Sequence, residues 1–371
     1  MIITDIRYYP YRVPFKRPFT TAHGTLMARE GVIVELVTDA GISGYGDMAA
    51  VTEFGAPDVA TLLRVAREVE PQFVEKDPMK IPYSSENWAD GGLPGPLTFA
   101  IETAIGSVMK RFLIRLCEET PEGAGFAEWF IRPFAPVRLN ATIGAVSIDE
   151  AVKTAIEAKI AGFTCIKLKV GMLGSIRDEV ERIFAVRAAI GPSIHFRLDA
   201  NEAWSFDDAL AIMQQLGAMN IQFVEQPLIH TALAEIPKLR ARVAMPIGLD
   251  ETVSDYASYQ QVSHLADVFI LKPQMLGRIA TEKIVHQNIR HRNLVMTTSL
   301  ESGIGVVATL KIASNLRKKL LECGLATLSL LEDDLIQEEI VIKNGMMYPP
   351  TAPVTPDWDA LARYRLDVEG Q

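Results

Sequence analysis

The feature that most constrains this chain is a long alternation of short apolar segments with amphipathic ones, which begins at Val137. Short apolar runs between segments with helical spacing of apolar residues predict strands that alternate with helices. The predicted strands are 137–142, 165–170, 194–199, 222–225, 246–250, 268–272 and 294–298, with an eighth near 325–331. The predicted helices are 149–161, 175–190, 205–219, 232–241, 255–264, 277–291 and 304–322. This alternation implies parallel strands with helical crossovers, and it favours a closed (β/α) barrel over an open, doubly wound sheet.

The first third of the chain has a different, α+β pattern. The predicted elements are strands at 2–9 and 31–38, a hairpin turn at 39–46, and helices at 58–73 and 97–118. The glycines of the turn match the spacing of no phosphate-binding loop. A proline-containing segment, 119–136, marks a boundary. We therefore expect an α+β domain over 1–130, a barrel over 131–331, and a tail, 332–371, that returns to the first domain.

The composition excludes several classes of protein. Of 371 residues, 49% are hydrophobic, which excludes intrinsic disorder, and the net charge of −9 argues against a nucleic-acid partner. No segment has the run of uncharged apolar residues that spans a bilayer, and the N-terminus lacks the pattern of a signal peptide. Three scattered cysteines argue against a disulfide scaffold or a thiolate zinc site. We expect a cytoplasmic protein with no membrane or nucleic-acid partner.

Charged residues stand at the carboxyl ends of five consecutive predicted strands. Strands of a barrel are expected to be apolar because both faces are buried, and an unpaired buried charge is costly. The charges occur in Ile166-Lys167-Leu168-Lys169-Val170, Leu198-Asp199-Ala200-Asn201, Val224-Glu225-Gln226-Pro227, Gly248-Leu249-Asp250-Glu251 and Leu271-Lys272-Pro273. In a parallel barrel these ends meet at one face, which carries the catalytic groups. The sequence therefore predicts a site there.

Asp199, Glu225 and Asp250 follow three neighbouring predicted strands. Converging carboxylates repel one another unless a cation lies between them. Hard oxygen ligands suit Mg²⁺, with Mn²⁺ as a substitute, and no His or Cys stands at an equivalent strand end to favour a softer metal. Separate salt bridges at the rim are the alternative. We expect a Mg²⁺ site formed by these side chains.

Three lysines flank these carboxylates. Side chains alternate along a strand, so Lys167 and Lys169 point to the same side, and Lys272 approaches from the other side of the carboxylates. Neighbouring cations and burial both lower the pKa of a lysine, and a neutral lysine acts as a general base. A metal stabilises the charge that forms on a carboxylate. The set therefore favours abstraction of the proton α to the carboxylate of a small substrate.

In its order and spacing, this set of motifs resembles the enolase superfamily, in its muconate-lactonizing-enzyme-like subgroup, over nearly the whole chain. The resemblance implies a modified TIM barrel, (β/α)7β, and an α+β capping domain formed by the N-terminal segment and the C-terminal tail. It implies one bound Mg²⁺ and a tendency to form homo-oligomers. The implied metal ligands are Asp199, Glu225 and Asp250, and the implied catalytic residues are Lys169, Lys272 and Lys167.

Segments 297–305, 324–327 and 17–24 are most similar to o-succinylbenzoate synthases of menaquinone biosynthesis. This similarity implies a lyase that dehydrates 2-succinyl-6-hydroxy-2,4-cyclohexadiene-1-carboxylate to o-succinylbenzoate. N-succinylamino-acid racemases share a similar seventh-strand segment and stay an alternative. Dipeptide epimerases are another, although their Asp-x-Asp motif is replaced here by the residues 332–334, Glu-Asp-Asp. A third alternative is a non-catalytic binding protein on the same scaffold.

The proposed chemistry assigns roles to further residues. Lys169 removes the α-proton, whereas Lys272 acts as a cation in a synthase and as a second acid–base group in a racemase. Loops 15–25 and 49–58 mix Gly or Pro with aromatic residues and are suited to close over the barrel mouth. Hydroxyl and backbone N–H groups after the seventh strand are suited to hold a succinyl carboxylate, and Glu301 is a candidate for orienting Lys272 or another cation. The predicted substrate-binding residues are Asn201, Arg197, Ser299, Ser302, Gly303, Phe19, His23 and Phe54.

Overall fold

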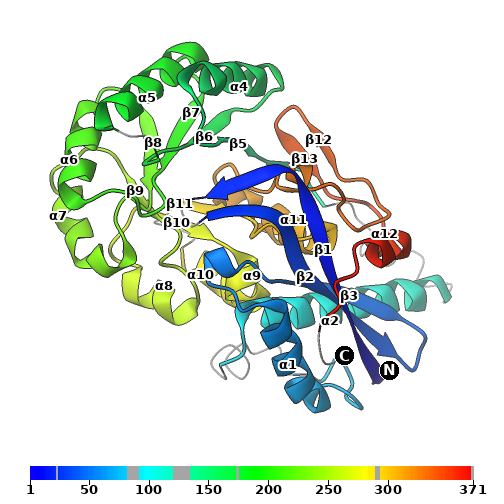
Figure 1. Ribbon diagram of the computed structural model, residues 1–371. Helices are drawn as coiled ribbons and strands as arrows, with labels where there is room; N and C mark the ends of the chain where they lie inside the picture. The colour runs from blue at the N-terminus through cyan, green and yellow to red at the C-terminus, as the bar shows by residue number, and fades with distance from the viewer. Residues whose placement is uncertain (22–23, 82–91, 120–133, 173–174, 289–292, 369–371) are drawn as a thin grey trace.

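The computed structural model describes residues 1–371 except 22–23, 82–91, 120–133, 173–174, 289–292 and 369–371. Within this part of the chain, an antiparallel sheet lies beside a set of parallel strands surrounded by helices (Figure 1). Among the described residues, no helix is both long enough and apolar enough to cross a membrane.

The N-terminal part forms a three-stranded antiparallel sheet that packs against helices. Its elements are β1 (Ile3–Thr21), β2 (Gly24–Thr38), β3 (Ser43–Ala49), η1 (Thr52–Phe54), α1 (Val59–Val69), η2 (Glu70–Gln72) and α2 (Gly95–Glu119). Val32, Val34 and Leu36 alternate along β2 and are fully buried in one core with Leu62 of α1 and Ala104 of α2. The alternation of apolar residues in β2 therefore creates the face on which the helices pack.

Two glycines of the β2–β3 hairpin allow helix α2 to pack closely on strand β3. The two strands pair antiparallel across a tight turn, which confirms the predicted hairpin. A Cβ atom on Gly44 would lie 2.2 Å from the carbonyl oxygen of Ala104, and one on Gly46 would lie 2.0 Å from that of Ala100. No side chain fits at either position, so α2 packs directly on the backbone of β3.

Seven parallel strands form the second sheet, in the order β11-β10-β9-β8-β7-β6-β5. They are β5 (Asn140–Ile143), β6 (Cys165–Lys169), β7 (His195–Asp199), β8 (Ile221–Glu225), β9 (Ile247–Leu249), β10 (Val268–Leu271) and β11 (Asn293–Met296). Figure 1 shows helices around them, and these are α4 (Ile148–Ile160), α5 (Ile176–Ile190), α6 (Phe206–Gln215), α7 (Ile236–Arg240), α8 (Tyr256–Val262), α9 (Pro273–Leu276), α10 (Arg278–Gln287) and α11 (Gly303–Leu316). The short helices η4 (His230–Glu235) and η5 (Arg317–Lys319) directly precede α7 and follow α11. Ser147, Ser175 and Ser205 cap α4, α5 and α6. The predicted α/β fold, a TIM-barrel-like domain with an antiparallel cap, is confirmed.

The strand that closes the barrel lies earlier in the chain than predicted. Gly324 forms a parallel bridge to Thr297, after β11, and Cys323 forms one to Leu139, beside β5. The segment ending at Gly324 therefore links the two edges of the seven-stranded sheet. The predicted strand at 325–331 is therefore wrong, because η6 (Leu328–Leu330) lies there instead. The predicted helix 304–322 is confirmed as α11, but its predicted end is too late, because α11 and η5 end before the closing segment.

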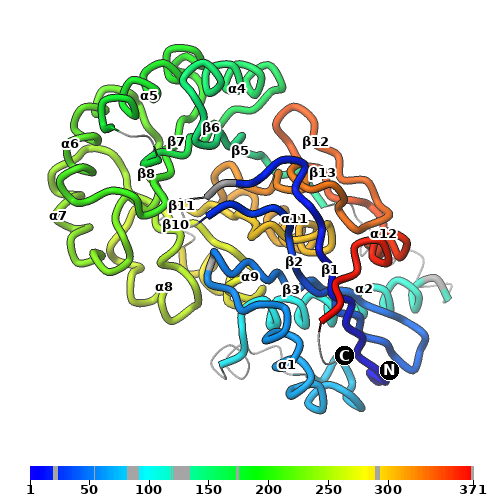
Figure 2. Tube along the Cα trace, in the orientation of Figure 1, coloured from blue at the N-terminus to red at the C-terminus, as the bar shows by residue number. Residues whose placement is uncertain are grey.

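The C-terminal tail forms a third, three-stranded sheet with the start of the barrel segment and then returns to the first sheet. β12 (Val341–Lys343) pairs with β13 (Met346–Tyr348), which pairs with β4 (Val137–Arg138) at the start of the barrel. After α12 (Trp358–Arg363), the chain returns to β1, where the backbone N–H of Leu366 donates to the carbonyl of Pro10 at 3.0 Å. Figure 2 shows the red end of the chain beside the dark blue start of β1. The tail thus connects the antiparallel sheet with the barrel.

The segment predicted as a loop at 15–25 is mostly strand. Thr21 at the end of β1 pairs with Gly24 at the start of β2, and Phe19 pairs with Leu26. Thr and Phe favour extended backbone, which explains why the two strands continue through this segment. The predicted boundary at 119–136 lies largely outside the described residues, so the domain limits stay a prediction.

Candidate active site

The predicted charged residues lie together because their strands are in register. Parallel pairing places Lys169 opposite Asp199, and Asp199 opposite Glu225. Asp250 directly follows β9, and Lys272 directly follows β10. The charges therefore gather at the carboxyl ends of the strands, where barrel enzymes carry their active sites.

The ammonium group of Lys167 bridges two of the carboxylates, and that of Lys169 contacts one of them. The Nζ of Lys167 is 2.6 Å from Oε1 of Glu225 and 2.8 Å from Oδ2 of Asp199. The same oxygen of Asp199 is 2.6 Å from Nζ of Lys169. Both carboxylates are buried, so these pairs are shielded from the solvent that weakens ion pairs on a protein surface.

Burial and pairing together set the protonation of this group. Burial would raise the pKa of Asp199, but Lys167 and Lys169 outweigh it and hold that pKa well below its usual range. Burial and the charge of Asp199 raise the pKa of Glu225 to about 8, in spite of Lys167. The two carboxylates are therefore unequal, and Glu225 is the one that lacks enough positive charge nearby.

The prediction that burial and neighbouring cations lower the lysine pKa values is wrong for Lys167 and Lys272. Burial does lower the pKa of Lys272, but Asp250 and Glu251 raise it by more. Burial likewise lowers the pKa of Lys167, and its carboxylate partners raise it above its ordinary value. Both lysines act here as counterions of the carboxylates.

The set of oxygen donors suits a hard divalent cation. Asp199, Glu225 and Asp250 offer carboxylates from neighbouring strands, which are ligands of the type that Mg²⁺ takes. The Oδ1 atom of Asp250 is buried and has no hydrogen-bond partner among the described residues. In the described part of the chain, no three His, Cys, Asp or Glu side chains already converge as metal ligands. Ammonium groups stand between the carboxylates instead, so a cation would have to displace them.

A chain of hydrogen bonds extends the site beyond the predicted ligands. The Nζ of Lys169 donates to Oδ1 of Asn201 at 2.6 Å, and Nδ2 of Asn201 donates to Oε1 of Glu251 at 2.7 Å. The backbone N–H of Asp250 donates to Oε1 of Gln226 at 3.0 Å. Asn201 and Gln226 adopt left-handed backbone, with φ of 43° and 38°, a strained conformation that is common at functional sites. Glu251 and Gln226 had no predicted role, although each directly follows a predicted metal ligand.

The side chain of Arg197 forms hydrogen bonds inside the barrel and does not reach the barrel mouth. Its side chain is fully buried. Its Nε donates to Oε1 of Gln222 at 2.6 Å, NH1 to the carbonyl of Glu322 at 2.7 Å, and NH2 to Oε2 of Glu322 at 3.0 Å. The expected substrate contact is thus replaced by an internal ion pair. Arg197 stands two positions before the strand end at Asp199, so it lies below the site.

In the segment after β11, backbone N–H groups that were expected to bind substrate donate hydrogen bonds to other parts of the protein instead. The N–H of Ser302 donates to Oδ2 of Asp47 at 2.8 Å, and that of Gly303 donates to the carbonyl of Asp334 at 2.7 Å. Neither N–H group is directed at a ligand in this arrangement. The buried hydroxyl of Ser299 has no hydrogen-bond partner among the described residues and stays a candidate.

Glu301 lies where the barrel meets the cap. Its side chain is fully buried, and its Oε2 accepts a hydrogen bond from the backbone N–H of Ser299 at 2.8 Å. Burial raises the pKa of Glu301 to about 8, and the nearby charge of Asp47 adds to this, while Arg29 opposes it. The structure therefore groups Glu301 with Asp47 and Arg29 of the cap.

Of the three residues of the cap that were predicted to contact substrate, the structure describes the side chain of one. Phe19 stacks on Phe15 with ring centres 5.4 Å apart, within a hydrophobic cluster of the cap and tail. His23 lies outside the described residues. Phe54 belongs to η1, and its side chain is outside the description. A role of these residues in substrate binding stays a prediction.

Comparison with known families matches both parts of the chain. The family described as "Mandelate racemase / muconate lactonizing enzyme, N-terminal domain" matches residues 3–114. The family described as "Enolase C-terminal domain-like" matches residues 150–359.

Similar proteins divide among three activities. The o-succinylbenzoate synthase of Thermobifida fusca is 32% identical over 240 residues, covering 63% of this chain and 73% of the relative. The D-Ala-D/L-Ala epimerase of Cytophaga hutchinsonii is 29% identical over 320 residues, 84% of each protein. The N-succinyl-L-Arg/Lys racemase of Bacillus cereus is 27% identical over 294 residues, 77% of each. The identity is higher for the synthase, whereas the coverage is greater for the other two.

Solved structures share the fold across the whole chain. The N-succinyl Arg/Lys racemase from Bacillus cereus superposes with a TM-score of 0.85 at 21% identity, covering 99% of both chains. The dipeptide epimerase from Cytophaga hutchinsonii, in complex with Mg and the dipeptide D-Ala-L-Val, gives a TM-score of 0.81 at 23% identity, covering 98% of both chains. At these identities the likeness extends to the fold alone.

Proposed function

Because this chain belongs to the mandelate racemase / muconate lactonizing enzyme family of the enolase superfamily, we propose that it is a Mg²⁺-dependent lyase that abstracts the proton α to a carboxylate. The proposed reaction is that of an o-succinylbenzoate synthase in menaquinone biosynthesis, the loss of water from 2-succinyl-6-hydroxy-2,4-cyclohexadiene-1-carboxylate. The observation that carries this proposal is the row of lysines and buried carboxylates at the strand ends. The 32% identity to a synthase supports this reaction.

Lys169 is the proposed base. Its Nζ, held at 2.6 Å from Oδ1 of Asn201, takes the proton from the ring carbon next to the carboxylate. The same proton then goes to the departing hydroxyl group, so that the electron pair of the broken C–H bond completes the aromatic ring and water leaves. Lys167 and Lys272, as ammonium cations, stabilise the negative charge that develops on the substrate carboxylate.

A bound Mg²⁺ would supply further positive charge to that carboxylate, and the fit of the donor set supports this cofactor. Its proposed ligands are Asp199, Glu225 and Asp250. A cation at these oxygens would also free the lysines from their role as counterions. Ser299, with its unpartnered hydroxyl, is the proposed contact for the distal carboxylate of the substrate.

The dehydration assay tests this proposal directly. Purified protein with Mg²⁺ is expected to convert the cyclohexadiene carboxylate, and Lys169→Ala is expected to lower the rate about 10²–10⁴-fold because it removes the general base. Lys153→Ala, on the exposed face of α4, is the matched control and should keep full activity. Absence of dehydration by the unmodified protein, or dehydration that survives Lys169→Ala, would refute the assignment.

A racemase or epimerase is the second candidate, and a specific observation favours it. Lys169 and Lys272 pair with different carboxylates, Asp199 and Asp250, so the site holds two separately positioned lysines, as a two-base reaction requires. Incubation in D₂O with N-succinylamino acids or Ala-Glu dipeptides would reveal it through deuterium at the α-carbon. Lys272→Arg keeps the cation, so dehydration should persist in this variant whereas two-base racemisation should be lost.

A further inference from the structure

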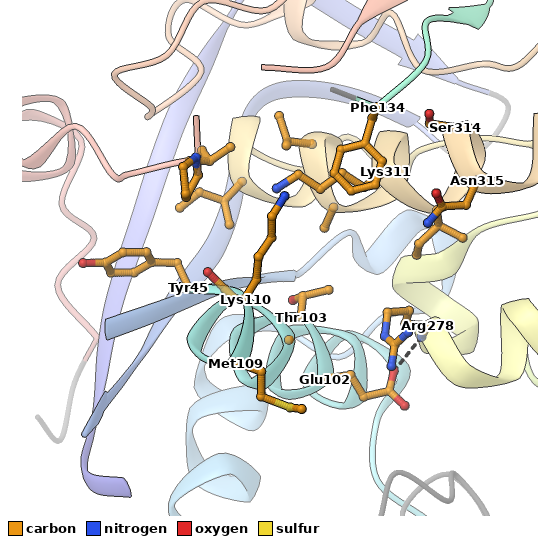
Figure 3. Close-up of a pocket in the computed structure, with 18 of the residues that line it drawn as sticks. Tyr45, Glu102, Thr103, Met109, Lys110, Phe134, Arg278, Lys311, Ser314 and Asn315 are labelled. Carbon is orange, nitrogen blue, oxygen red and sulfur yellow. Dashed lines mark hydrogen bonds between the residues drawn. The ribbon is translucent and has the colours of Figure 1, made fainter. Parts of the chain in front are cut away.

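A large cavity lies outside the barrel, between α2, α10, α11 and the tail (Figure 3). Its volume is about 1020 Å³, at the upper end of the range for small-molecule pockets. Ile304, Val307 and Ala308 of α11 contribute an apolar wall. None of the strand-end lysines and carboxylates lines this cavity. It is therefore distinct from the proposed active site.

Two lysines reach toward the same part of this cavity from different helices. Figure 3 shows Lys110 extending from α2 and Lys311 extending from α11, both beside Phe134. The Nζ of Lys110 is 4.8 Å from the centre of the Phe134 ring, and that of Lys311 is 5.9 Å from it. Among the described residues, neither lysine forms an ion pair with a carboxylate. Two cations thus share one end of the cavity, with an aromatic ring as their common contact.

The electrostatics at this end are unfavourable without an anion. Burial, followed by the charges of Lys110 and Arg111, lowers the pKa of Lys311 to about 8, and the attraction of Glu338 does not offset them. Burial also lowers the pKa of Lys110. An anion placed between the two ammonium groups would relieve both the repulsion and the loss of hydration.

The charges at the opposite end already satisfy one another. The carboxylate of Glu102 accepts a hydrogen bond from the backbone N–H of Arg278 at 2.6 Å, which Figure 3 marks by a dashed line. The guanidinium NH1 of Arg278 donates to Oε1 of Glu282 at 2.8 Å. Arg317 also lines the cavity, but it is exposed, and its NH1 donates to the carbonyl of Ser314 at 3.0 Å. Lys110 and Lys311 are therefore the two cations that approach one another inside the cavity (Figure 3).

We propose that this cavity binds a small amphipathic anion, whose carboxylate or phosphate head lies between Lys110 and Lys311 and whose apolar body lies along α11. The paired lysines match an anionic head, and the apolar wall matches a hydrocarbon body. The site shares no residue with the proposed reaction, so it goes beyond that function and does not depend on it.

Isothermal titration calorimetry with four probes tests this site. Decanoate and decyl phosphate present the two heads on the same body, so comparing them identifies the preferred head. Decanol, which lacks the charge, and inorganic phosphate, which lacks the body, are expected to bind at least tenfold more weakly, because hydrogen bonds to charged groups are worth about 1.5–3 kcal/mol. Binding of decanol as tight as that of decanoate would overturn the proposed role of the lysines.

Substitutions of residues that line the cavity test whether the probes bind there. Lys110→Met and Lys311→Met are each expected to weaken binding of the preferred probe about tenfold or more. Lys318→Met, at an exposed position just after α11, is the matched control and should bind as the unmodified protein does. Ala308→Trp fills the cavity without a change of charge and should abolish binding. Circular dichroism verifies that each variant is folded.

A comparison with the barrel mouth separates the two sites. Lys169→Ala should leave the affinity for decanoate or decyl phosphate unchanged, because that lysine lies outside the cavity. Loss of affinity in Lys169→Ala, retention of it in Ala308→Trp, or absence of binding to the unmodified protein would each overturn the inference. No turnover is measured, so the result stands whether or not dehydration is observed.

Discussion

The Nζ of Lys272 lies 2.7 Å from Oδ2 of Asp250, while Oδ1 of the same carboxylate is buried without a hydrogen-bond partner among the described residues. A buried oxygen of this kind carries a desolvation cost that a second cation would offset. One oxygen is thus held by the lysine and the other is free to bind a metal. This division makes Asp250 the most direct test of the proposed Mg²⁺ site.

Asp250→Asn is expected to abolish the stabilisation by Mg²⁺. A ligand present at 100 times its Kd stabilises the native state by about 2.7 kcal/mol, which appears as a rise in Tm. Differential scanning calorimetry should show this rise in the unmodified protein and in Asp149→Asn, an exposed control on α4. A chelator should reverse it and stop dehydration. An equal rise in Asp250→Asn would rule out that carboxylate as a ligand.

Arg197→Met is expected to destabilise the fold and leave the substrate KM unchanged. The substitution removes the fully buried cation that pairs with Glu322 and leaves that carboxylate only its contacts with the more exposed Arg138 and His195. Breaking a buried pair in this way costs up to about 3–5 kcal/mol. Urea denaturation measures this loss. Arg7→Met removes an exposed pair with Asp5 and should cost about 0–1 kcal/mol. A raised KM at unchanged stability would instead support the prediction that Arg197 contacts the substrate.

The stability of the protein should depend on pH through Glu301. Burial raises its folded-state pKa from 4.5 to about 8, so the native state retains a proton that the unfolded state releases between these values. The free energy of unfolding therefore falls as the pH rises through this window. Glu301→Gln has no such proton, so its stability relative to the unmodified protein should increase from pH 4.5 to about 8 and then level off.

Urea denaturation at several pH values measures this difference. Glu157→Gln, at an exposed position of α4, is the control and should show no comparable trend. A difference between Glu301→Gln and the unmodified protein that stays constant with pH would show that Glu301 is ionised in the folded state.

Substitution by alanine should change the stability of the protein in opposite directions at two glycines of the cap. A Cβ on Gly46 would lie 2.0 Å from the carbonyl oxygen of Ala100, so Gly46→Ala is expected to destabilise by about 1–3 kcal/mol through overpacking. Gly106, inside α2, has open space at its Cβ position, so Gly106→Ala should stabilise by about 0.5–1 kcal/mol through reduced backbone entropy. Thermal denaturation of both variants compares them. Similar stabilities would show that α2 shifts readily on the sheet.

Much of the barrel was predictable because its signal is local. Each strand is a short apolar run, and each intervening helix has its own apolar face, so neighbouring residues reveal both. The charges of Lys169, Asp199 and Glu225 were recognisable for the same reason, since a charge at the end of a buried strand is unusual wherever that strand lies. Parallel register then brings these residues together.

The closing strand and the hydrogen-bond partners were not predictable in this way. The segment ending at Gly324 has no strong strand pattern, and its role appears only when both edges of the sheet meet it. Asp334 takes the N–H of Gly303, and Glu322 takes the guanidinium of Arg197. These partners are distant in the chain, so the residues next to Gly303 and Arg197 do not predict them.

The sequence by itself determined the alternating strands and helices, the family, and the set of carboxylates and lysines available for catalysis. Only the tertiary structure decided which lysines neutralise which carboxylates, and hence that the pKa values of Lys167 and Lys272 rise. The reason is physical. Periodicity and strand ends depend on residues adjacent in the chain, whereas pairing and pKa values depend on distances and burial that exist only after the strands assemble.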